Sequence, residues 1–313
     1  MKNFSILFLA LLLAACGGDS SENSNSDTTG NTPAANTNNE GSSANSTEPA
    51  ATPAPIYEDL SEHATDIPGL IRAQADYMAG GQAMRGYVAY PEGSTGRLPA
   101  VIVIHEWWGH NQYARSRADQ LAELGYVAMA VDMYGDGKQA AHPDDAGSFA
   151  MAVMGDAEVA KSRFEAALFT LKNYPFVDPE QIAAIGYCFG GSVALTMANA
   201  GYDLDAVAAF HSGVNLPIWP EGENSVKAQV LVCNGADDPF ISAEDEANFK
   251  SEMEAARVDF EYINYPGAQH AFTDPGADAK GAQFELPLAY NAEADEASWE
   301  KLKDLLASVF TTN

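Results

Sequence analysis

Short apolar segments alternate with amphipathic segments along this chain, from about residue 70 to its end. The Val/Ile-rich run 100–104 is typical of a buried strand in a parallel sheet. Segment 113–124 places its apolar residues on one helical face, as a helix packed on such a sheet does. By these criteria we expect strands at 75–78, 87–90, 100–104, 126–131, 182–187, 206–210, 229–233 and 260–264, and helices at 113–124, 160–171, 192–200, 243–256 and 294–310.

The alternation of strands and helices predicts one α/β domain with a mostly parallel sheet that carries helices on both faces. The first two strands, 75–78 and 87–90, are close enough in sequence to form a hairpin. In open parallel sheets, ligands and catalytic groups lie at the carboxyl ends of the strands. We therefore look for the chemistry in the loops that follow the strands.

The first 16 residues have the pattern of an export signal. Lys2 precedes an apolar run, 4–13, which ends in Leu-Ala-Ala-Cys at Cys16. The run is too short to span a bilayer as a mature helix. The last four residues resemble a bacterial lipobox, which implies cleavage before Cys16 and lipidation of its thiol. An ordinary secretory signal is the alternative.

Residues 17–55 are rich in Ser, Asn, Thr, Ala and Pro, and contain no aromatic residue, Lys or Arg. Such a segment buries too little apolar surface to fold, so we expect a disordered tether. The α/β domain then occupies 56–313. We expect an exported protein on the periplasmic side of the bacterial outer membrane, attached to the membrane only through lipid on Cys16.

The composition narrows the possible partners. The formal net charge is −28, from 16 basic and 44 acidic residues, so the surface should repel nucleic acid and anionic lipid. Apart from Cys16 the chain has two cysteines, Cys188 and Cys233, which is no disulfide framework. In an oxidising compartment these two could pair. We expect free thiols, because a pair would inactivate Cys188 if it is a nucleophile.

Cys188 lies in the most informative stretch of the chain, Gly-Tyr-Cys-Phe-Gly-Gly at 186–191. It follows the expected strand 182–187 and precedes the expected helix 192–200. This is the layout of a nucleophile elbow with cysteine as the nucleophile. Glycines at 186 and 190 would permit the sharp turn, and the helix amino terminus would favour the thiolate. A structural cysteine in a glycine-rich turn is the alternative.

A cysteine nucleophile needs a base, and the base needs an orienting acid. Asp237 and Asp238 follow the expected strand 229–233, and His270 follows the strand 260–264. These residues stand in the order nucleophile, acid, histidine that such elbows use. Taken alone, His270 could be a solvated loop histidine.

Three separated motifs make the chain similar to the dienelactone hydrolase family: 186–191, Asp-Pro-Phe-Ile at 238–241 and Gly-Ala-Gln-His-Ala-Phe at 267–272. The loop 133–138, Met-Tyr-Gly-Asp-Gly-Lys, also resembles one of that family, and the similarity extends over roughly 70–310. It implies an α/β-hydrolase fold and a triad that cleaves esters or lactones. Cys188 would be the nucleophile, His270 the base and Asp238 the acid, with Asp237 as the second choice.

The resemblance also gives roles to residues that follow strand 100–104. Glu106 would contact the resting thiol, and the backbone N–H groups of Trp107 and Phe189 would form the oxyanion hole. A structural ion pair is the alternative for Glu106, and core packing is the alternative for the tryptophan. The histidines of His-Glu-Trp-Trp-Gly-His are five residues apart, whereas the zinc motif needs four, so we expect no metal and no cofactor.

The chain departs from the family at Asp274, which stands where an arginine would hold the carboxylate of a dienelactone. A carboxylate there should repel an anionic substrate, so we expect a neutral ester or lactone as the small-molecule substrate. Trp107, Trp108, Phe189 and Trp219 are candidates to line its pocket. His211 follows a strand, and it could face the site or be an ordinary loop histidine.

Two other functions compete with hydrolysis. One is a lipid-anchored binding protein that has lost turnover, although the motifs of the triad are intact. The other is a thiol-dependent acyltransferase or redox protein, for which only Cys233 could act as a resolving cysteine. The complete set of motifs favours the hydrolase.

Overall fold

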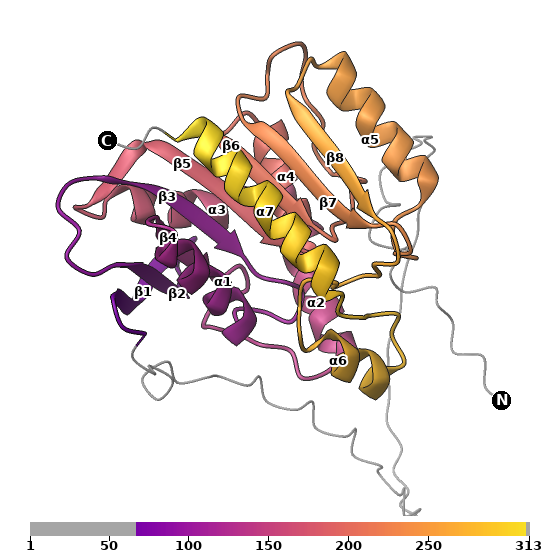
Figure 1. Ribbon diagram of the computed structural model, residues 1–313, viewed down its shortest axis with the longest axis horizontal. Helices are drawn as coiled ribbons and strands as arrows, with labels where there is room; N and C mark the ends of the chain where they lie inside the picture. Colours follow the sequence, from indigo (N-terminus) through magenta and orange to yellow (C-terminus); the bar gives the residue numbers. More distant parts are fainter. Residues whose placement is uncertain (1–66, 311–313) are drawn as a thin grey trace, which may run out of the picture. The chain divides into compact units, whose positions relative to one another are not determined.

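The structure is a computed structural model that describes residues 67–310. The predicted signal peptide 1–16, the tether 17–55 and the expected domain start at 56 lie outside the described residues. The described residues contain an eight-stranded sheet with the strand order β1-β2-β4-β3-β5-β6-β7-β8 (Figure 1). Its strands are β1 (Leu70–Ala79), β2 (Gln82–Pro91), β3 (Leu98–Ile104), β4 (Val127–Val131), β5 (Val177–Tyr187), β6 (Ala206–Phe210), β7 (Gln229–Gly235) and β8 (Phe260–Tyr265).

The sheet is mostly parallel, as expected. β1 pairs with β2, and β2 with β4, in antiparallel fashion, while all neighbouring pairs from β4 to β8 are parallel. The continuous apolar runs of β3, β4 and β6 are buried on both faces, which is why their sequences do not alternate. The prediction of an α/β-hydrolase sheet is confirmed.

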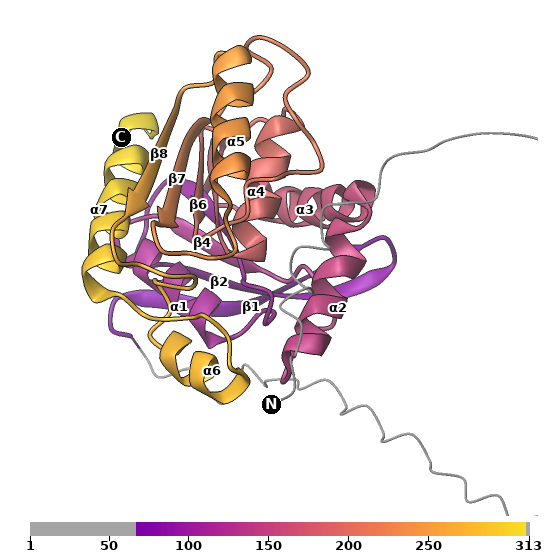
Figure 2. The same ribbon diagram turned by 90° about the vertical axis from the view of Figure 1, so that its right-hand side faces the viewer.

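Helices cover both faces of the sheet (Figure 2). Apolar residues of α1 and α7 pack on one face, and those of α2, α3, α4 and α5 pack on the other. The helices are α1 (Gln112–Glu123), α2 (Pro143–Met154), α3 (Ala157–Lys172), α4 (Phe189–Asn199), α5 (Ala243–Ala255), α6 (Ala277–Phe284) and α7 (Ala292–Val309). Among the described helices, none is both long enough and apolar enough to cross a membrane.

Two helices were not expected from the sequence, α2 and α6. α2 begins with Pro143 and two aspartates, which resembles a loop, but its buried Ala146, Ala150 and Val153 recur at helical spacing. α6 is only eight residues long and contains Gly281, so local propensity alone would not form it. Its apolar residues pack in a small cluster with Trp108.

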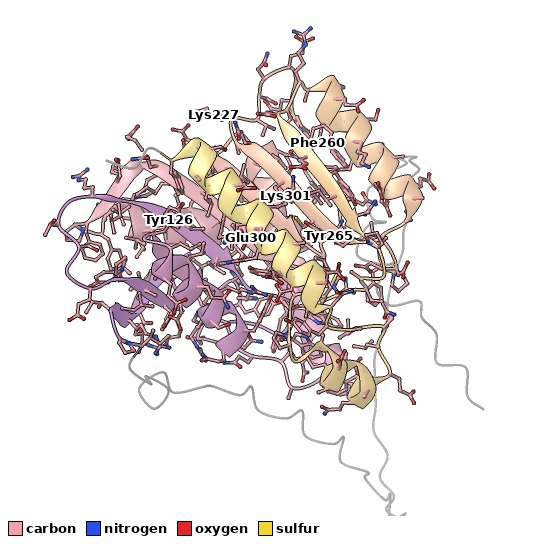
Figure 3. The ribbon with its side chains drawn as sticks, viewed as in Figure 1. Tyr126, Lys227, Phe260, Tyr265, Glu300 and Lys301 are labelled. Atoms are coloured by element: carbon pink, nitrogen blue, oxygen red, sulfur yellow. The ribbon has the colours of Figure 1, made fainter. Side chains whose placement is uncertain are left out.

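The parallel strands end at one edge of the sheet, where the loops after β3, β5, β6, β7 and β8 meet. In Figure 3, Phe260 marks the amino end of β8 and Tyr265 its carboxyl end. The loop of His270 follows Tyr265, and the turn of Cys188 follows β5. The topology thus brings residues that are far apart in sequence to one end of the sheet.

Candidate active site

Cys188 occupies the sharp turn between β5 and α4. Its backbone has φ 52° and ψ −116°, a conformation that non-glycine residues rarely adopt. A Cβ atom at Gly186 would lie 2.1 Å from the carbonyl oxygen of Gly190, and one at Gly190 would lie 2.3 Å from that of Ile104. The prediction that both positions require glycine is confirmed, and the turn leaves the thiol of Cys188 partly exposed.

His270 and Asp238 form a buried pair. The Nδ1 atom of His270 lies 2.7 Å from Oδ2 of Asp238, and Oδ1 of Asp238 accepts the N–H of Phe240 at 2.9 Å. The neighbouring Asp237 is exposed. Of the two candidate acids, the structure therefore brings Asp238 to the histidine.

The third member of the predicted triad is also within reach, because the side chain of His270 is hydrogen-bonded to Cys188. Burial alone would lower the pKa of His270, but the negative charges of Asp238 and Cys188 raise it well above its ordinary value. The surroundings of His270 therefore stabilise its protonated form, the imidazolium.

The amino terminus of α4 packs against the end of β3. Phe189 is the first residue of α4, where the backbone N–H groups have no acceptor within the helix. Its ring stacks on His105 at 5.7 Å, and a Cβ atom at Gly190 would lie 2.6 Å from the carbonyl oxygen of His105. The loop that carries Trp107 thus runs beside the elbow, as the oxyanion-hole prediction requires.

His105 has a structural role. Its Nδ1 atom lies 2.5 Å from the carbonyl oxygen of Glu106, and its Nε2 atom accepts the N–H of Met133 at 3.1 Å. Both ring nitrogens are therefore occupied, and burial lowers the pKa of the ring. Neither nitrogen is free to bind a metal.

Glu106 is a buried carboxylate at the site. It is 2% exposed, and neither of its carboxylate oxygens has a hydrogen-bond partner among the described residues. Burial and the nearby charge of Asp274 raise its pKa to about 7, although Lys280, His270 and Arg117 act in the opposite direction. The alternative of a structural ion pair stays open, because Nζ of Lys280 lies 4.0 Å from Oε2 of Glu106, which is a long ion pair without a hydrogen bond.

Lys280 was not identified from the sequence, and it changes the role expected for Asp274. Its Nζ atom lies 2.7 Å from Oδ2 of Asp274, while Oδ1 accepts the N–H of Gly276 at the start of α6. Asp274 therefore anchors α6, and its charge is matched by that of Lys280. The repulsion of anions that we expected from Asp274 is offset by this pair.

Aromatic side chains surround the same corner. Trp107 meets Trp108 edge to face at 5.1 Å, and Trp108 stacks on Phe284 of α6 at 5.7 Å. Trp108 is buried and Trp107 is only partly so. Trp107 is thus the better placed of the two to contact a ligand, while Trp108 supports α6.

Trp219 lies elsewhere. It packs on Phe249 of α5, and the adjacent Ile218 accepts a hydrogen bond from Asn199, the last residue of α4. An α-helix rises about 1.5 Å per residue, so this end of α4 is roughly 16 Å from Cys188. The structure does not bring Trp219 to the elbow, and our expectation that it lines the pocket is wrong.

His211 is a neighbour of His270 and not an ordinary loop residue. It is fully buried, and its ring meets that of His270 edge to face at 5.3 Å. Its Nε2 atom lies 2.7 Å from the hydroxyl of Thr273.

Tyr134 is a further residue at the site that sequence reasoning missed. Its hydroxyl donates to the carbonyl oxygen of Trp107 at 3.0 Å, and its ring lies 5.4 Å from that of Phe189. Burial and the charges of Cys188 and Asp132 raise its pKa well above the ordinary value, so it stays a donor. The signal was present in the loop 133–138, whose N–H groups at 134, 135 and 137 are held by the carboxylate of Asp132.

Cys233 is free but buried, and burial raises its pKa to about 12. It is therefore a poor candidate for a reactive thiol.

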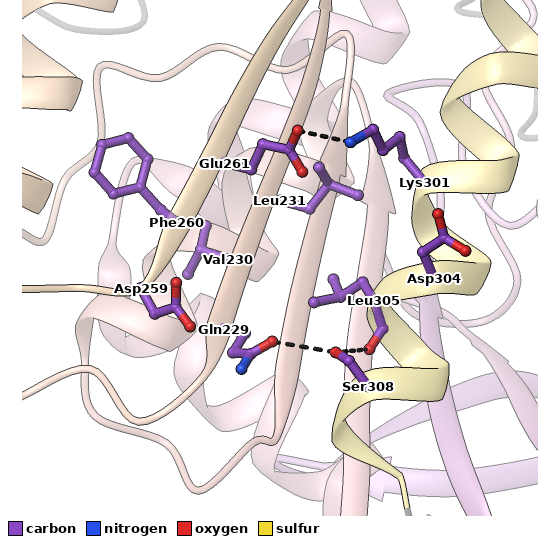
Figure 4. A pocket seen from close by; sticks show the side chains of 10 residues that line it. All are labelled: Gln229, Val230, Leu231, Asp259, Phe260, Glu261, Lys301, Asp304, Leu305 and Ser308. Atoms are coloured by element: carbon purple, nitrogen blue, oxygen red, sulfur yellow. Dashed lines mark hydrogen bonds and ion pairs between the residues drawn. The ribbon is translucent and has the colours of Figure 1, made fainter.

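A groove of about 260 Å³ lies between β7, β8 and α7, where Glu261 and Lys301 pair at 2.8 Å (Figure 4). Gln229 and Phe260, the first residues of β7 and β8, line it. It is therefore at the opposite end of the strands from His270.

Comparisons with known proteins show which family this chain resembles. The model of the Dienelactone hydrolase family matches residues 84–310. A protein of Synechocystis sp. named "Putative carboxymethylenebutenolidase" is 29% identical over 234 residues, which cover 70% of this chain and 89% of that protein.

Two solved structures are similar over 78% of this chain and 100% of theirs. The one named m3DLH is 37% identical with a TM-score of 0.73. The other, a "Dienelactone Hydrolase-like Promiscuous Phospotriesterase P91 from Metagenomic Libraries", is 34% identical with a TM-score of 0.71. The chain therefore belongs to the dienelactone hydrolase family, and it is an α/β-hydrolase that acts on esters or lactones.

Proposed function

We propose that this enzyme cleaves a carboxylic ester or lactone through a Cys188-His270-Asp238 triad and an acyl-thioester intermediate. The observation that supports this most strongly is the line of contacts from Asp238 to His270 to Cys188. Nucleophile, base and orienting acid are each held by a different loop at the carboxyl edge of the sheet. No other pair of carboxylate and histidine among the described residues stands next to a partly exposed thiol.

In the first step, the thiolate of Cys188 attacks the ester carbonyl, and a sulfur–carbon bond forms. The backbone N–H groups of Phe189 and Trp107 donate to the oxyanion, and each such donor typically contributes about 3 kcal/mol in the transition state. The imidazolium of His270 then protonates the leaving alkoxide as the carbon–oxygen bond breaks. Asp238 holds the ring so that Nε2 faces the reacting atoms.

In the second step, neutral His270 takes a proton from water, which attacks the thioester. The carbon–sulfur bond breaks, the carboxylic acid leaves, and Cys188 returns as thiolate beside the imidazolium. Glu106 lies within electrostatic range of His270 and has a pKa of about 7. We place it against the resting thiol, where its proton state changes near neutral pH.

The proposed substrate carries no free carboxylate next to the scissile bond. Lys280 is the cation beside Glu106, with its Nζ atom 4.0 Å from that carboxylate. Asp274 already holds the same Nζ atom at 2.7 Å. An anionic substrate would have to break that pair beside a second carboxylate, Glu106. The partly exposed Trp107 suits an apolar group instead.

The test uses residues 56–313 and p-nitrophenyl acetate. Wild type should turn the ester over, and Cys188→Ala should abolish turnover while the circular dichroism spectrum is retained. Cys233→Ala is the matched control, because it removes the other thiol of the domain and should leave kcat unchanged. Turnover that survives in Cys188→Ala would refute the nucleophile.

A substrate panel then tests the specificity. Neutral lactones and acetyl esters should give higher kcat/KM than half-esters of dicarboxylic acids. A neutral phosphotriester belongs in the panel, because the related P91 is named as a promiscuous phosphotriesterase. A preference for the half-esters would contradict the reasoning about Lys280 and Asp274.

We also propose that the enzyme is exported and lipid-anchored, which rests on the sequence before residue 56. The Leu-Ala-Ala-Cys ending at Cys16 supports it, as does the low-complexity segment 17–55. In a bacterial host the full chain should sediment with membranes, and Cys16→Ser should not be processed to the lipidated form. Equal membrane binding of an unmodified Cys16→Ser chain would overturn the anchor.

A further inference from the structure

Three buried side chains and the partly buried Tyr113 form a continuous hydrogen-bonded network behind His270. Nε of Arg117 donates to the hydroxyl of Tyr113 at 3.3 Å, that hydroxyl lies 2.6 Å from Oγ1 of Thr273, and Oγ1 lies 2.7 Å from Nε2 of His211. The ring of His211 then meets His270 at 5.3 Å. This hydrogen-bonded network runs from α1 to the loop of His270, and it is not part of the triad described above.

Arg117 suggests a direction for these hydrogen bonds. A guanidinium can only donate, so the oxygen of Tyr113 accepts from it, and the hydroxyl of Thr273 is the neighbour that can take the Tyr113 proton. The hydroxyl of Thr273 then has its own proton to give, and Nε2 of His211 is its acceptor. In this direction His211 is a neutral ring whose proton is on Nδ1, a buried nitrogen with no hydrogen-bond partner among the described residues.

A neutral His211 is what the catalytic step requires. His270 carries a positive charge between Asp238 and Cys188, and a second cation 5.3 Å away would oppose it. Burial, His270 and Arg117 all lower the pKa of His211, and the remaining polar groups around it are Tyr187 and Thr273. The hydrogen bond from Thr273 adds to this, because it stabilises the unprotonated Nε2.

Arg117, at the far end of this network from His270, is held by several contacts. Nη2 of Arg117 donates to the backbone carbonyl of Thr273 and to the carboxylate of Asp295 on α7, both at 2.6 Å. The guanidinium also lies 5.3 Å from the ring centres of Tyr113 and Trp299. Arg117 therefore holds the loop of His270 twice, through its backbone and through the side chain of Thr273.

We propose that Thr273, with Tyr113 and Arg117 behind it, is a positioning residue that fixes His211 as a neutral support for His270 and holds His270 toward Cys188. The proposal rests on the proposed function, since it assumes that His270 is the base. None of these residues touches the substrate, so their loss should lower kcat and leave KM nearly unchanged.

The test compares isosteric pairs. Thr273→Val and Tyr113→Phe interrupt the hydrogen-bonded network and change the side-chain volume little. Each should lower kcat roughly tenfold to a hundredfold, as small misplacements of a catalytic group do. Thr273→Ser keeps the hydroxyl and should rescue kcat. Tyr187→Phe is the matched control, because Tyr187 is also a tyrosine beside Arg117 and its hydroxyl has no partner among the described residues.

A second measurement does not depend on turnover. Nitrogen-15 NMR of the imidazoles should show His211 neutral with its proton on Nδ1 in wild type and in Tyr187→Phe, and a changed His211 signal in Tyr113→Phe. If wild type shows no Cys188-dependent turnover, the proposed function fails. The spectra still test whether the hydrogen-bonded network fixes the tautomer of His211.

Three results would overturn the positioning role. One is a wild-type kcat in both Thr273→Val and Tyr113→Phe. Another is an equal loss in Tyr187→Phe or in Thr273→Ser, which would mean that packing and not the hydrogen bond matters. The third is a His211 ring protonated on Nε2 in wild type. If Thr273→Val fails to fold, Tyr113→Phe alone carries the kinetic comparison.

Discussion

Replacing Glu106 by glutamine should stabilise the enzyme at alkaline pH and hardly at all at acidic pH. Glu106 is fully buried, without a hydrogen-bond partner for its carboxylate among the described residues, and its pKa is raised from 4.5 to about 7. Each pKa unit corresponds to about 1.4 kcal/mol, so ionised Glu106 is disfavoured in the folded state by about 3 kcal/mol. Glutamine has nearly the same shape and carries no charge.

The sign of the effect follows from proton binding. Between pH 4.5 and about 7 the folded protein holds the Glu106 proton and the unfolded chain has lost it, so wild-type stability falls as pH rises. Above pH 7 the loss is complete. The stability of Glu106→Gln relative to wild type should therefore grow across this window and reach up to about 3 kcal/mol at pH 8.

Urea unfolding at pH 4.5 and at pH 8 measures this difference. Glu123→Gln is the control, because it removes an equally negative but exposed carboxylate from a chain of net charge −28. It should change stability by at most a few tenths of a kcal/mol at both pH values. A Glu106→Gln effect that is equal at the two pH values, or a destabilisation at pH 8, would refute a buried carboxyl group whose ionisation is disfavoured in the folded state.

Two other substitutions have defined outcomes. Asp238→Asn should lower kcat by at least about a hundredfold, because the imidazolium loses its carboxylate partner. Asp237→Asn, at an exposed position, should not lower kcat. Equal kcat values in the two variants would exclude Asp238 as the orienting acid. Gly190→Ala should lower the melting temperature and abolish turnover, since its Cβ would lie 2.3 Å from the backbone oxygen of Ile104; a stable, active variant would show that the elbow is less tightly packed.

Much of the fold could be predicted because its signals are local. The runs that became β3, β4 and β6 are uninterrupted and apolar, and the stripes of α1 and α7 are regular. α6 could not be predicted, because eight residues with a glycine form this helix with the help of tertiary contacts: Asp274 holds the N–H of Gly276 before it, and Trp108 packs against it. The hairpin β1–β2 was expected, but its full ten-residue strands were not.

The site was predictable where the chain order carries the information. The elbow follows β5, the acid follows β7 and the histidine follows β8, and parallel pairing brings the ends of these strands together. Lys280 and Tyr134 were missed, because their contacts with Asp274 and Trp107 depend on tertiary packing and not on spacing. Trp219 was expected in the pocket for the same reason: its position in the sequence does not show that it packs on Phe249 of α5.

The most direct test of the central claim is to trap the acyl-enzyme. Rapid acid quench of the enzyme with p-nitrophenyl acetate, followed by peptide mass analysis, should find one acetyl group on the peptide that contains Cys188. His270→Ala should slow its hydrolysis, and Cys188→Ala should carry none. Steady turnover without an adduct on Cys188, or an adduct on another side chain that forms and decays at the rate of turnover, would contradict the proposed mechanism.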